Sequence, residues 1–477
     1  MAATHRKSIR EVSPIEVYQQ LPRTNCGECG ETNCMAFATR LVNREVLPEA
    51  CPPILRPEAA QAYAVLSLLL APPVRAVTIG TGGRAIVAGG KYVLQRHEFT
   101  YHNPAPIAID VADTLPEKER EARVKAITPF SYQYIGRDLS LDAIAVRAAS
   151  GDPATFRRAV AQVASLTDHP LILCTLDPAV MAAALEEVGK RRPLLYGATE
   201  GNWKAMADLA LSHRCPLVAT APGDVALLRS LVRTLRACGI DDLVLDPGTF
   251  PDSGLAATVQ AFTDIRRAAF EGSDELLGYP LLGVPMAAWL GEEMAPELVQ
   301  WKEACLAALL LTRYADLLVM HSLEGWTLLP PLIWRFNLYT DPRRPVSVEA
   351  GLRAVGSPGR SSPIIVTTNY ALTFFTVESD LKGGHVDCHL LVVDTGGISV
   401  ESAVAGRYLT AATIAGAVKS SEVERAVDHR YLVLPGLAAR LSGETEEATG
   451  WRVLVGPKDS SGLPGFLSTK WPPEKPS

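Results

Sequence analysis

The chain has 477 residues and a formal net charge of −6 at pH 7, with 48% hydrophobic and 21% charged residues. Its length is typical of about three domains, and its charge lacks the basic excess of a nucleic-acid-binding protein. The most apolar run, at 304–323, is interrupted by Arg313 and Asp316, which argues against a membrane span, and no apolar run follows the basic N-terminal residues. We therefore expect a globular cytoplasmic protein that binds neither nucleic acid nor a membrane.

Residues 1–57 are predicted to form a small module with two helices. The sequence Ser13-Pro14-Ile15-Glu16 combines a serine N-cap, a proline at the first helical position and a returning glutamate, which predicts the start of a helix. A second helix is expected after Cys34, because apolar residues recur at helical spacing as far as Val46 before Pro48 ends the pattern.

Four of the nine cysteines lie close together in this module: Cys26, Cys29, Cys34 and Cys51. Clustered cysteines in a chain without an export signal indicate metal or redox chemistry rather than disulfides. Three thiolates within nine residues and a fourth across a helix suit a cluster of four irons that each need one terminal thiolate. Zinc is the alternative, but structural zinc sites usually pair their ligands, and two of these cysteines are single. The spacing therefore favours a [4Fe-4S] site.

The middle of the chain, residues 58–330, is predicted to hold a linker, a glycine-rich hairpin layer at 74–101 and a barrel. Apolar runs alternate with helical stretches at 107–112, 141–147, 171–176, 194–198, 216–220, 242–245, 281–287 and 317–321. Eight strand-helix units over roughly 220 residues match a (β/α)8 TIM barrel. An open doubly wound sheet is the alternative.

Polar residues follow several of these predicted strands, where barrel enzymes carry their active sites: Asp110, Asp113, Asp177, Glu200, Asn202, Asp224, Asp246 and His321. They are candidate general acids. However, Asp177 before Pro178 is typical of a helix N-cap, and Asp246 before Pro247-Gly248 is typical of a turn. We therefore favour structural roles for them, and we assign no catalytic residue.

Residues 331–477 are predicted to form a separate α/β domain with a Rossmann-like sheet. A stretch rich in proline and arginine at 330–362 marks the boundary. Strands are expected at 364–368, 390–394, 431–435 and 452–456, and glycine-containing turns follow three of them. Ligands bind beyond such strand ends in open α/β sheets, although the residues alone leave open whether these turns bind a ligand or only connect elements.

Several stretches resemble one known family. Asn25-Cys26-Gly27-Glu28-Cys29-Gly30 with Cys34 and Cys51 is similar to the iron-sulfur module of the large, or gamma, subunit of the corrinoid iron-sulfur protein, which belongs to the acetyl-CoA decarbonylase/synthase (CO dehydrogenase/acetyl-CoA synthase) system. Similar modules occur in electron-transfer subunits, so the C-terminal stretches matter more: Thr367–Thr373, Val386–Val400, Leu434–Gly443 and Gly450–Gly462. The resemblance covers essentially the whole chain.

The resemblance implies a methyl carrier of the acetyl-CoA pathway. A corrinoid (cobamide) in the C-terminal domain would accept a methyl group on Co(I) from methyltetrahydrofolate or methyltetrahydrosarcinapterin, through a methyl-pterin:corrinoid methyltransferase, and deliver it to acetyl-CoA synthase. The [4Fe-4S] cluster would reactivate Co(II). The implied partners are that methyltransferase, acetyl-CoA synthase and a small (delta) subunit that forms a heterodimer with this chain.

The strand-end turns and the resemblance together give the candidate corrinoid contacts: Thr367, Thr368, Asn369, Thr373, Asp394, Gly396, Gly397, Ile398, Ser399, Pro435, Gly436, Leu437, Gly456, Ser460, Ser461 and Gly462. The chain lacks the Asp-x-His-x-x-Gly signature of corrinoid domains with a histidine ligand, and His385, His389 and His429 do not have its spacing. We therefore expect cobalt without a histidine ligand.

Two other functions are compatible with parts of the chain. A barrel methyltransferase that acts on methyl-pterin with an iron-sulfur appendage is the main alternative. A plain electron-transfer subunit would explain the cysteines but would leave residues 331–477 without a role.

Overall fold

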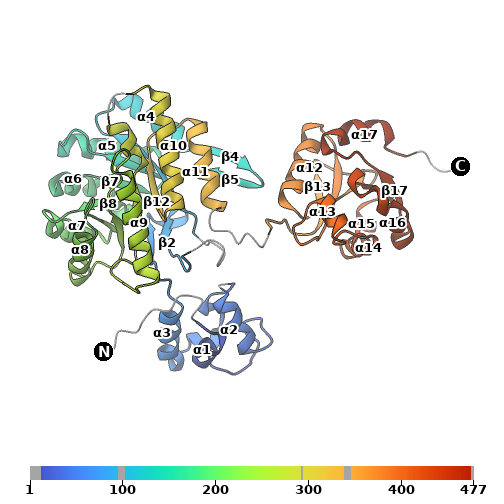
Figure 1. Cartoon of the computed structure of the whole chain (residues 1–477), viewed down its shortest axis with the longest axis horizontal. Coiled ribbons are helices and arrows are strands. Elements are labelled where there is room, and N and C mark those ends of the chain that lie inside the picture. The colour runs from blue at the N-terminus through green and yellow to red at the C-terminus, as the bar shows by residue number, and fades with distance from the viewer. Residues whose placement is uncertain (1–11, 44, 95–102, 292–293, 338–344, 474–477) are drawn as a thin grey trace. The chain divides into compact units, whose positions relative to one another are not determined.

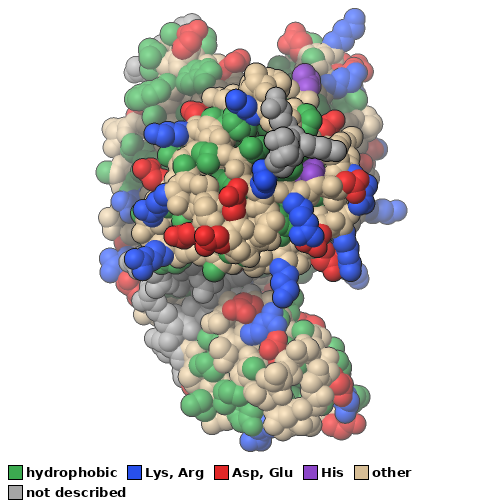
Figure 2. All heavy atoms as spheres, turned by 90° about the vertical axis from the view of Figure 1, so that its right-hand side faces the viewer, with side chains coloured by type: hydrophobic (Ala, Val, Ile, Leu, Met, Phe, Trp, Pro, Cys, Tyr) green, Lys and Arg blue, Asp and Glu red, His purple; other side chains and the backbone are tan. Residues whose placement is uncertain are grey.

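A computed structural model of the chain describes residues 12–43, 45–94, 103–291, 294–337 and 345–473. The chain divides into two compact units: one formed by residues up to Thr340 apart from Gln133–Asp138, and one formed by that short segment and Asp341 onward. Within the described ranges, no helix is long and apolar enough to cross a membrane. On the face drawn in Figure 2, basic and acidic side chains are interspersed, in keeping with the modest net charge.

The N-terminal module has a small core of its own. The predicted capping box is present, with Ser13 and Glu16 bonded to each other's backbone N–H groups at the start of α1. Three 3-10 turns each begin at a proline, which fixes φ and needs no N–H partner there. The elements are α1 (Pro14–Gln20), α2 (Cys34–Val42), η2 (Pro48–Ala50), η3 (Pro52–Leu55), η4 (Pro57–Ala59) and α3 (Ala60–Leu69). Helix α3 buries Leu66 fully in this core, so the core extends past residue 57.

The predicted barrel is present in the first unit. Its eight strands are all parallel, in the order β10-β9-β8-β7-β6-β3-β12-β11. A parallel bridge between Leu245 and Leu281 joins the two ends of the sheet, so the barrel is nearly closed. The strands are β3 (Ile107–Ala112), β6 (Ala143–Arg147), β7 (Leu171–Cys174), β8 (Leu194–Ala198), β9 (Leu217–Thr220), β10 (Leu243–Asp246), β11 (Leu282–Gly283) and β12 (Leu317–Met320).

Helices surround this barrel, as Figure 1 shows: α4 (Glu117–Ile127), α5 (Pro153–Leu166), α6 (Pro178–Val188), α7 (Trp203–His213), α8 (Val225–Ala237), α9 (Leu255–Phe270), α10 (Pro296–Thr312) and α11 (Gly325–Asn337), with the short turns η7 (Gly189–Arg191) and η8 (Pro285–Leu290). Two hairpins accompany it: β1 (Ala76–Ile79) with β2 (Ile86–Gly89), which contain η5 (Gly82–Arg84), and β4 (Ser131–Tyr134) with β5 (Arg137–Ser140). Helix α11 continues through Pro330 and Pro331, past the predicted boundary, because Leu328 and Leu332 anchor it in the core.

The barrel has two apolar layers. One fills the space between the strands and the helices. The other fills the barrel interior, where Ala108, Ile172, Val218 and Val244 pack against the β1–β2 hairpin through residues such as Ile79. The hairpin therefore covers one end of the interior.

The second unit contains a five-stranded sheet in the order β13-β15-β14-β16-β17. Strand β13 is antiparallel to β15, and the other four are parallel. The strands are β13 (Gly351–Val355), β14 (Ile364–Thr368), β15 (Cys388–Val393), β16 (Tyr431–Leu434) and β17 (Arg452–Val455). The helices are α12 (Ala371–Gly383), α13 (Val400–Ala405), α14 (Ala411–Ser420), α15 (Val423–Ala426), η9 (Gly436–Leu441), α16 (Ser442–Thr449), η10 (Ser460–Gly462) and α17 (Leu463–Lys470).

Both faces of this sheet are covered. Ile364 and Val366 pack in a core with α13 and α14, whereas Ile365 packs in the opposite core with α12 and α17. This alternation follows from the period of two in a strand. The result is a three-layer α/β arrangement whose four parallel strands end at the same edge.

Candidate functional site

Three of the four clustered cysteines, Cys29, Cys34 and Cys51, belong to the N-terminal core. Cys34 and Cys51 are buried, Cys29 is half-buried and Cys26 is exposed. Burial raises the pKa of the Cys51 thiol, and the neighbouring thiols of Cys29, Cys34 and Cys26 add to this rise. Within the described residues, however, no group of three or more Cys, His, Asp or Glu side chains is arranged so that it could hold a metal ion.

Two contacts and two glycines fix the backbone around these cysteines. The Asn25 side-chain oxygen accepts a hydrogen bond from the Cys34 backbone N–H at 2.9 Å, which holds the first cysteine loop against the start of α2. The Arg56 guanidinium lies 3.7 Å from the Glu28 carboxylate, so the segment after Cys51 reaches the same loop. Gly27 and Gly30 have φ values of 75° and 84°, in the left-handed region that glycine adopts without strain.

A cavity of about 410 Å³ lies in the second unit at the carboxyl edge of the sheet. It is bordered by the ends of β14 and β16 and by α12. After β14 the chain passes to β15 on one side and then crosses to β16 on the other, so β14 and β16 flank the point where the strand order reverses. Ligands of open α/β sheets bind at such a point.

Two hydroxyl groups at the end of β14 lack partners. The Oγ1 atoms of Thr367 and Thr368 are buried and make no hydrogen bond within the described residues, and Thr367 lines the cavity. A buried hydroxyl without a partner costs roughly 1–3 kcal/mol. These hydroxyl groups therefore fit a site in which a polar ligand provides the missing hydrogen-bond partner.

The structure separates the predicted contact residues into two groups. Six line the cavity: Thr367, Thr373, Ser399, Pro435, Leu437 and Ser460. The others lie nearby but contact the protein itself: the Asn369 oxygen accepts hydrogen bonds from the backbone N–H groups of Thr395 and Gly397, both at 3.0 Å, and the Asp394 carboxylate accepts from Asn369 and Gly396. A side chain at Gly436 would meet the Lys458 backbone nitrogen at 2.7 Å, so this glycine allows the ends of β16 and β17 to approach.

Sequence reasoning missed several residues of the cavity wall. Leu372, Thr376 and Val377 come from the first turns of α12, Glu401 from the first turn of α13, and Lys458 from the loop after β17. The spacing of four residues from Leu372 to Thr376 places both on one face of the helix and could have indicated that this face lines the cavity. Turn glycines indicate only the loops.

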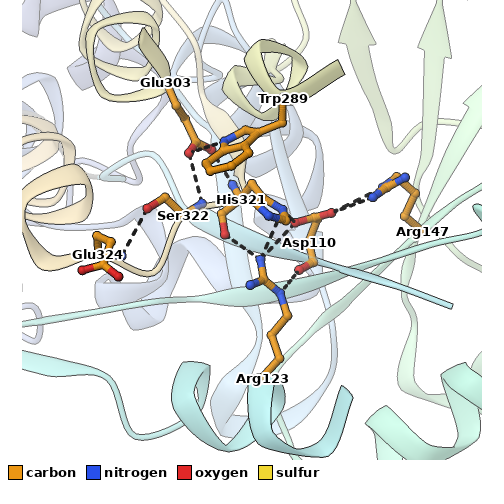
Figure 3. Close-up of polar contacts among 8 residues, drawn as sticks. All are labelled: Asp110, Arg123, Arg147, Trp289, Glu303, His321, Ser322 and Glu324. Carbon is orange, nitrogen blue, oxygen red and sulfur yellow. Dashed lines mark hydrogen bonds and ion pairs between the residues drawn. The ribbon is translucent and has the colours of Figure 1, made fainter. Parts of the chain in front are cut away.

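The barrel carries a polar network at the carboxyl ends of its strands (Figure 3). Asp110 of β3 is bonded by His321 at 2.5 Å and by Arg123 at 3.2 Å, and Arg147 at the end of β6 donates to it at 3.3 Å. Burial alone would raise the pKa of Asp110, but these three partners outweigh it and the pKa is lowered. Buried Glu303 of α10 accepts hydrogen bonds from Trp289 and from the backbone of His321 and Ser322.

Most other polar residues predicted at these strand ends have the structural roles that were favoured. Asp177 and Asp224 cap helices α6 and α8, and Asp113 accepts hydrogen bonds from Ser150. Asp246 bonds the Gly248 N–H of its turn at 2.9 Å, as its motif predicted, and also the side chains of Tyr196 and Thr220.

A four-thiol module, a (β/α)8 barrel and an α/β unit with a strand-end cavity define a multidomain iron-sulfur protein. Residues 21–53 match the family model described as "Putative Fe-S cluster". Residues 76–467 match the family described as "CO dehydrogenase/acetyl-CoA synthase delta subunit".

Similar proteins cover almost the whole chain. The acetyl-CoA decarbonylase/synthase complex subunit gamma of Archaeoglobus fulgidus is 45% identical over 469 residues, which are 97% of this chain and 99% of that protein. The subunit gamma of Methanosarcina acetivorans is 44% identical over 466 residues, 97% and 99% of the two chains, and that of Methanothermobacter thermautotrophicus 43% over 457 residues, 96% and 98%. The chain belongs to this family, the large corrinoid iron-sulfur subunits of the acetyl-CoA decarbonylase/synthase system. The barrel of Thermus thermophilus dihydropteroate synthase is also similar, with 19% identity, coverage of 54% of this chain and 98% of that one, and a TM-score of 0.36, too low to carry an argument.

Proposed function

We propose that the chain carries methyl groups on a corrinoid held at the carboxyl edge of its C-terminal sheet, a Rossmann-like domain, and that Cys26, Cys29, Cys34 and Cys51 hold a [4Fe-4S] cluster. The observation that supports this most directly is the unpartnered hydroxyl of Thr367, which lines the strand-end cavity. Bound there, the corrinoid would supply a cobalt centre that accepts a methyl group from methyl-tetrahydropterin and passes it to acetyl-CoA synthase, and the cluster would supply the electron that restores inactive cobalt.

The residues of the cavity would bind and shield this cofactor. The Thr367 hydroxyl would hydrogen-bond a polar group of the corrinoid, and Leu372 and Leu437, which are 49% and 41% exposed without it, would lose contact with water against its apolar surface. Burial of such side chains stabilises a complex. The chain's contribution is therefore binding, orientation and exclusion of water.

We propose that no histidine of this unit binds the cobalt. His389 lies at the amino end of β15, and His385 and His429 precede β15 and β16. All three are thus at the edge of the sheet opposite the cavity. In the electron paramagnetic resonance spectrum of the Co(II) state, a strong hyperfine coupling to an axial nitrogen would contradict this.

A surface of α10 and α11 is our proposed contact with the small delta subunit. Adjacent helices α10 and α11 expose three tryptophans, Trp301, Trp326 and Trp334, together with Leu298. Exposed apolar patches mark interaction sites, and tryptophan is enriched in their centres. Because the relatives are named as subunits of a complex, we assign this face to a partner subunit and keep the methyltransferase and the synthase as transient partners in the cytoplasm.

Metal and cofactor analysis tests the proposal. The full chain, purified without oxygen with and without its partner subunit, should contain about four irons and bind cobalt as a corrinoid with visible absorption. Iron without any corrinoid, even after corrinoid and partner are supplied, would refute the methyl-carrier function and would leave an electron-transfer subunit.

A further inference from the structure

The inner wall of the barrel changes character along its strands. In an interior layer, the strands contribute apolar side chains such as Ala108, Ala145 and Val244. Two residues further along, on the same face of each strand, seven strands present polar or titratable side chains: Asp110, Arg147, Cys174, Tyr196, Thr220, Asp246 and, directly after β12, His321. A barrel with only a structural role is filled by branched apolar residues through all its layers.

This polar layer adds little to the stability of the fold, because the hydrogen bonds and ion pairs of its buried carboxylates only offset the cost of burying them. Asp110 and Asp246 are each only 2% exposed, and a buried carboxylate destabilises a protein unless it is paired and hydrogen-bonded. Apolar residues of similar volume would stabilise the barrel more. The layer therefore indicates a purpose other than stability, and it lies at the end of the barrel where this fold binds its ligands.

Both oxygens of each carboxylate in the layer already accept hydrogen bonds from the protein. Both Asp110 oxygens accept hydrogen bonds from His321, Arg123 and Arg147, and both Asp246 oxygens accept from Tyr196, Thr220 and Gly248. The groups that remain without a partner among the described residues are the Nη1 donor of Arg147 and the Nε2 atom of His321.

The unused groups belong to Arg147 and His321, whose side chains are each 33% exposed; because His321 donates Nδ1–H to Asp110, its Nε2 donates to a ligand only when the ring is protonated. Arg147 uses Nε and Nη2 on Asp110, and the part of the chain that the structure describes provides no partner for its Nη1. His321 uses Nδ1 on Asp110 and stacks on Trp289, with 4.6 Å between ring centroids, which leaves Nε2 available. Two arginines and one histidine surround Asp110, and the Glu303 carboxylate lies on the other side of His321 (Figure 3), so the cationic group with an unused N–H is Arg147.

From this geometry we propose that the open end of the barrel binds a small ligand through an oxyanion, either a carboxylate or a phosphate, with Arg147 and His321 as the groups that contact it. A guanidinium with free N–H groups matches an oxyanion in charge and geometry. Asp110 is a positioning residue, because it holds Arg147 and His321 side by side. The site is independent of the corrinoid cavity, which lies in the other unit.

Tryptophan 289 provides a probe that does not depend on methyl transfer. The full chain labelled with 5-fluorotryptophan gives one fluorine signal for each of its 7 tryptophans, and the Trp289 signal is identified by its loss in Trp289→Phe. Inorganic phosphate and succinate are titrated separately at constant ionic strength. We expect at least one of them to shift the Trp289 signal to a plateau, and the one that does so with the lower midpoint identifies the oxyanion.

Arg147→Gln should raise that midpoint by about tenfold or more, the loss expected for one charge-assisted contact, whereas Arg147→Lys should recover part of it. Arg157→Gln is the matched control, because Arg157 lies on the outer surface in ion pairs with Glu186 and Glu187; it should leave the midpoint unchanged. An unmoved Trp289 signal with both anions, or an equal midpoint in wild type and in an Arg147→Gln protein whose other signals are native, overturns the proposal.

Discussion

The hydroxyl of Thr367 offers a test in which stability and cofactor binding change in opposite directions. Thr367→Val keeps the shape of the side chain and removes a buried oxygen that has no partner within the described residues. An unsatisfied buried hydroxyl costs roughly 1–3 kcal/mol, so the corrinoid-free protein should become more stable, by about 1 kcal/mol. The same substitution removes the hydrogen bond that we propose for the corrinoid, which should weaken its binding by about tenfold.

Two measurements on the full chain separate these effects. Hydrogen exchange followed by mass spectrometry gives the free energy of local unfolding of β14 without cofactor, and a titration with cobinamide gives the affinity. Thr445→Val is the matched control, because the Thr445 hydroxyl of α16 is equally buried and unpartnered but lies outside the cavity wall. It should stabilise the protein and leave the affinity unchanged.

Either of two results would refute the reasoning. If Thr367→Val binds cobinamide as tightly as wild type, the hydroxyl does not contact the cofactor. If the substitution instead lowers the free energy of unfolding of β14 without cofactor, the hydroxyl already has a partner inside the protein, and its burial is no sign of a ligand.

Three further predictions concern other parts of the molecule. Cys51→Ser should lower the iron content of the anaerobically purified chain, whereas Cys305→Ser, at an exposed cysteine outside the cluster, should not; equal iron in both would exclude the proposed ligand set. Burial lowers the pKa of Lys91 to about 7, so between about pH 7 and pH 10.5 the folded chain holds fewer protons than the unfolded chain. The free energy of unfolding should therefore rise with pH by up to about 1.4 kcal/mol per unit in this range. Denaturant titrations of Lys91→Met at several pH values should not show this rise. Trp301→Glu should weaken binding of the small subunit in sedimentation experiments. The control Leu211→Glu, which alters an exposed residue of α7, should not weaken it. Equal binding by both variants would show that the tryptophan surface is not part of the interface.

The strands were predictable because burial on both faces produces continuous apolar runs. Strand β3 occupies the predicted range 107–112, and β8 the predicted range 194–198. The run at 281–287 was predicted as a strand but forms only Leu282–Gly283 before η8 begins. Pro285 has no N–H to donate to a neighbouring strand, so the chain turns there despite its apolar composition.

The second N-terminal helix is shorter than its apolar pattern predicts. Apolar spacing continued to Val46, but α2 ends at Val42. The Glu45 side chain accepts hydrogen bonds from Arg40 and Asn43, and these local contacts accompany the end of the helix. Such contacts between side chains depend on rotamers, which periodicity does not reveal.

The candidate cavity was predicted at the correct strand ends but not in its full lining. Turn glycines and hydroxyl residues mark where strands end, which led to Thr367, Ser399 and Ser460. They do not reveal which of these side chains hydrogen-bond to the loop backbone instead of lining the cavity. Asn369 was a predicted cofactor contact, yet its oxygen holds the Thr395–Gly397 loop, and only the folded geometry distinguishes the two uses.

In both units, buried polar side chains lie at the carboxyl ends of parallel strands. In the barrel, Asp110 and Asp246 follow layers of apolar side chains, and in the C-terminal sheet the unpartnered Thr367 and Thr368 follow the buried residues of β14. Stability alone would place apolar residues at all these positions, because the same strands bury apolar side chains two residues earlier. The difference between the sites lies in what is left unpaired: hydroxyl groups over the C-terminal sheet and cationic donors in the barrel. An unpartnered neutral hydroxyl suits a large cofactor with amide side chains, whereas an unused guanidinium N–H suits an oxyanion, so the two ends should take different ligands and lose them through different substitutions.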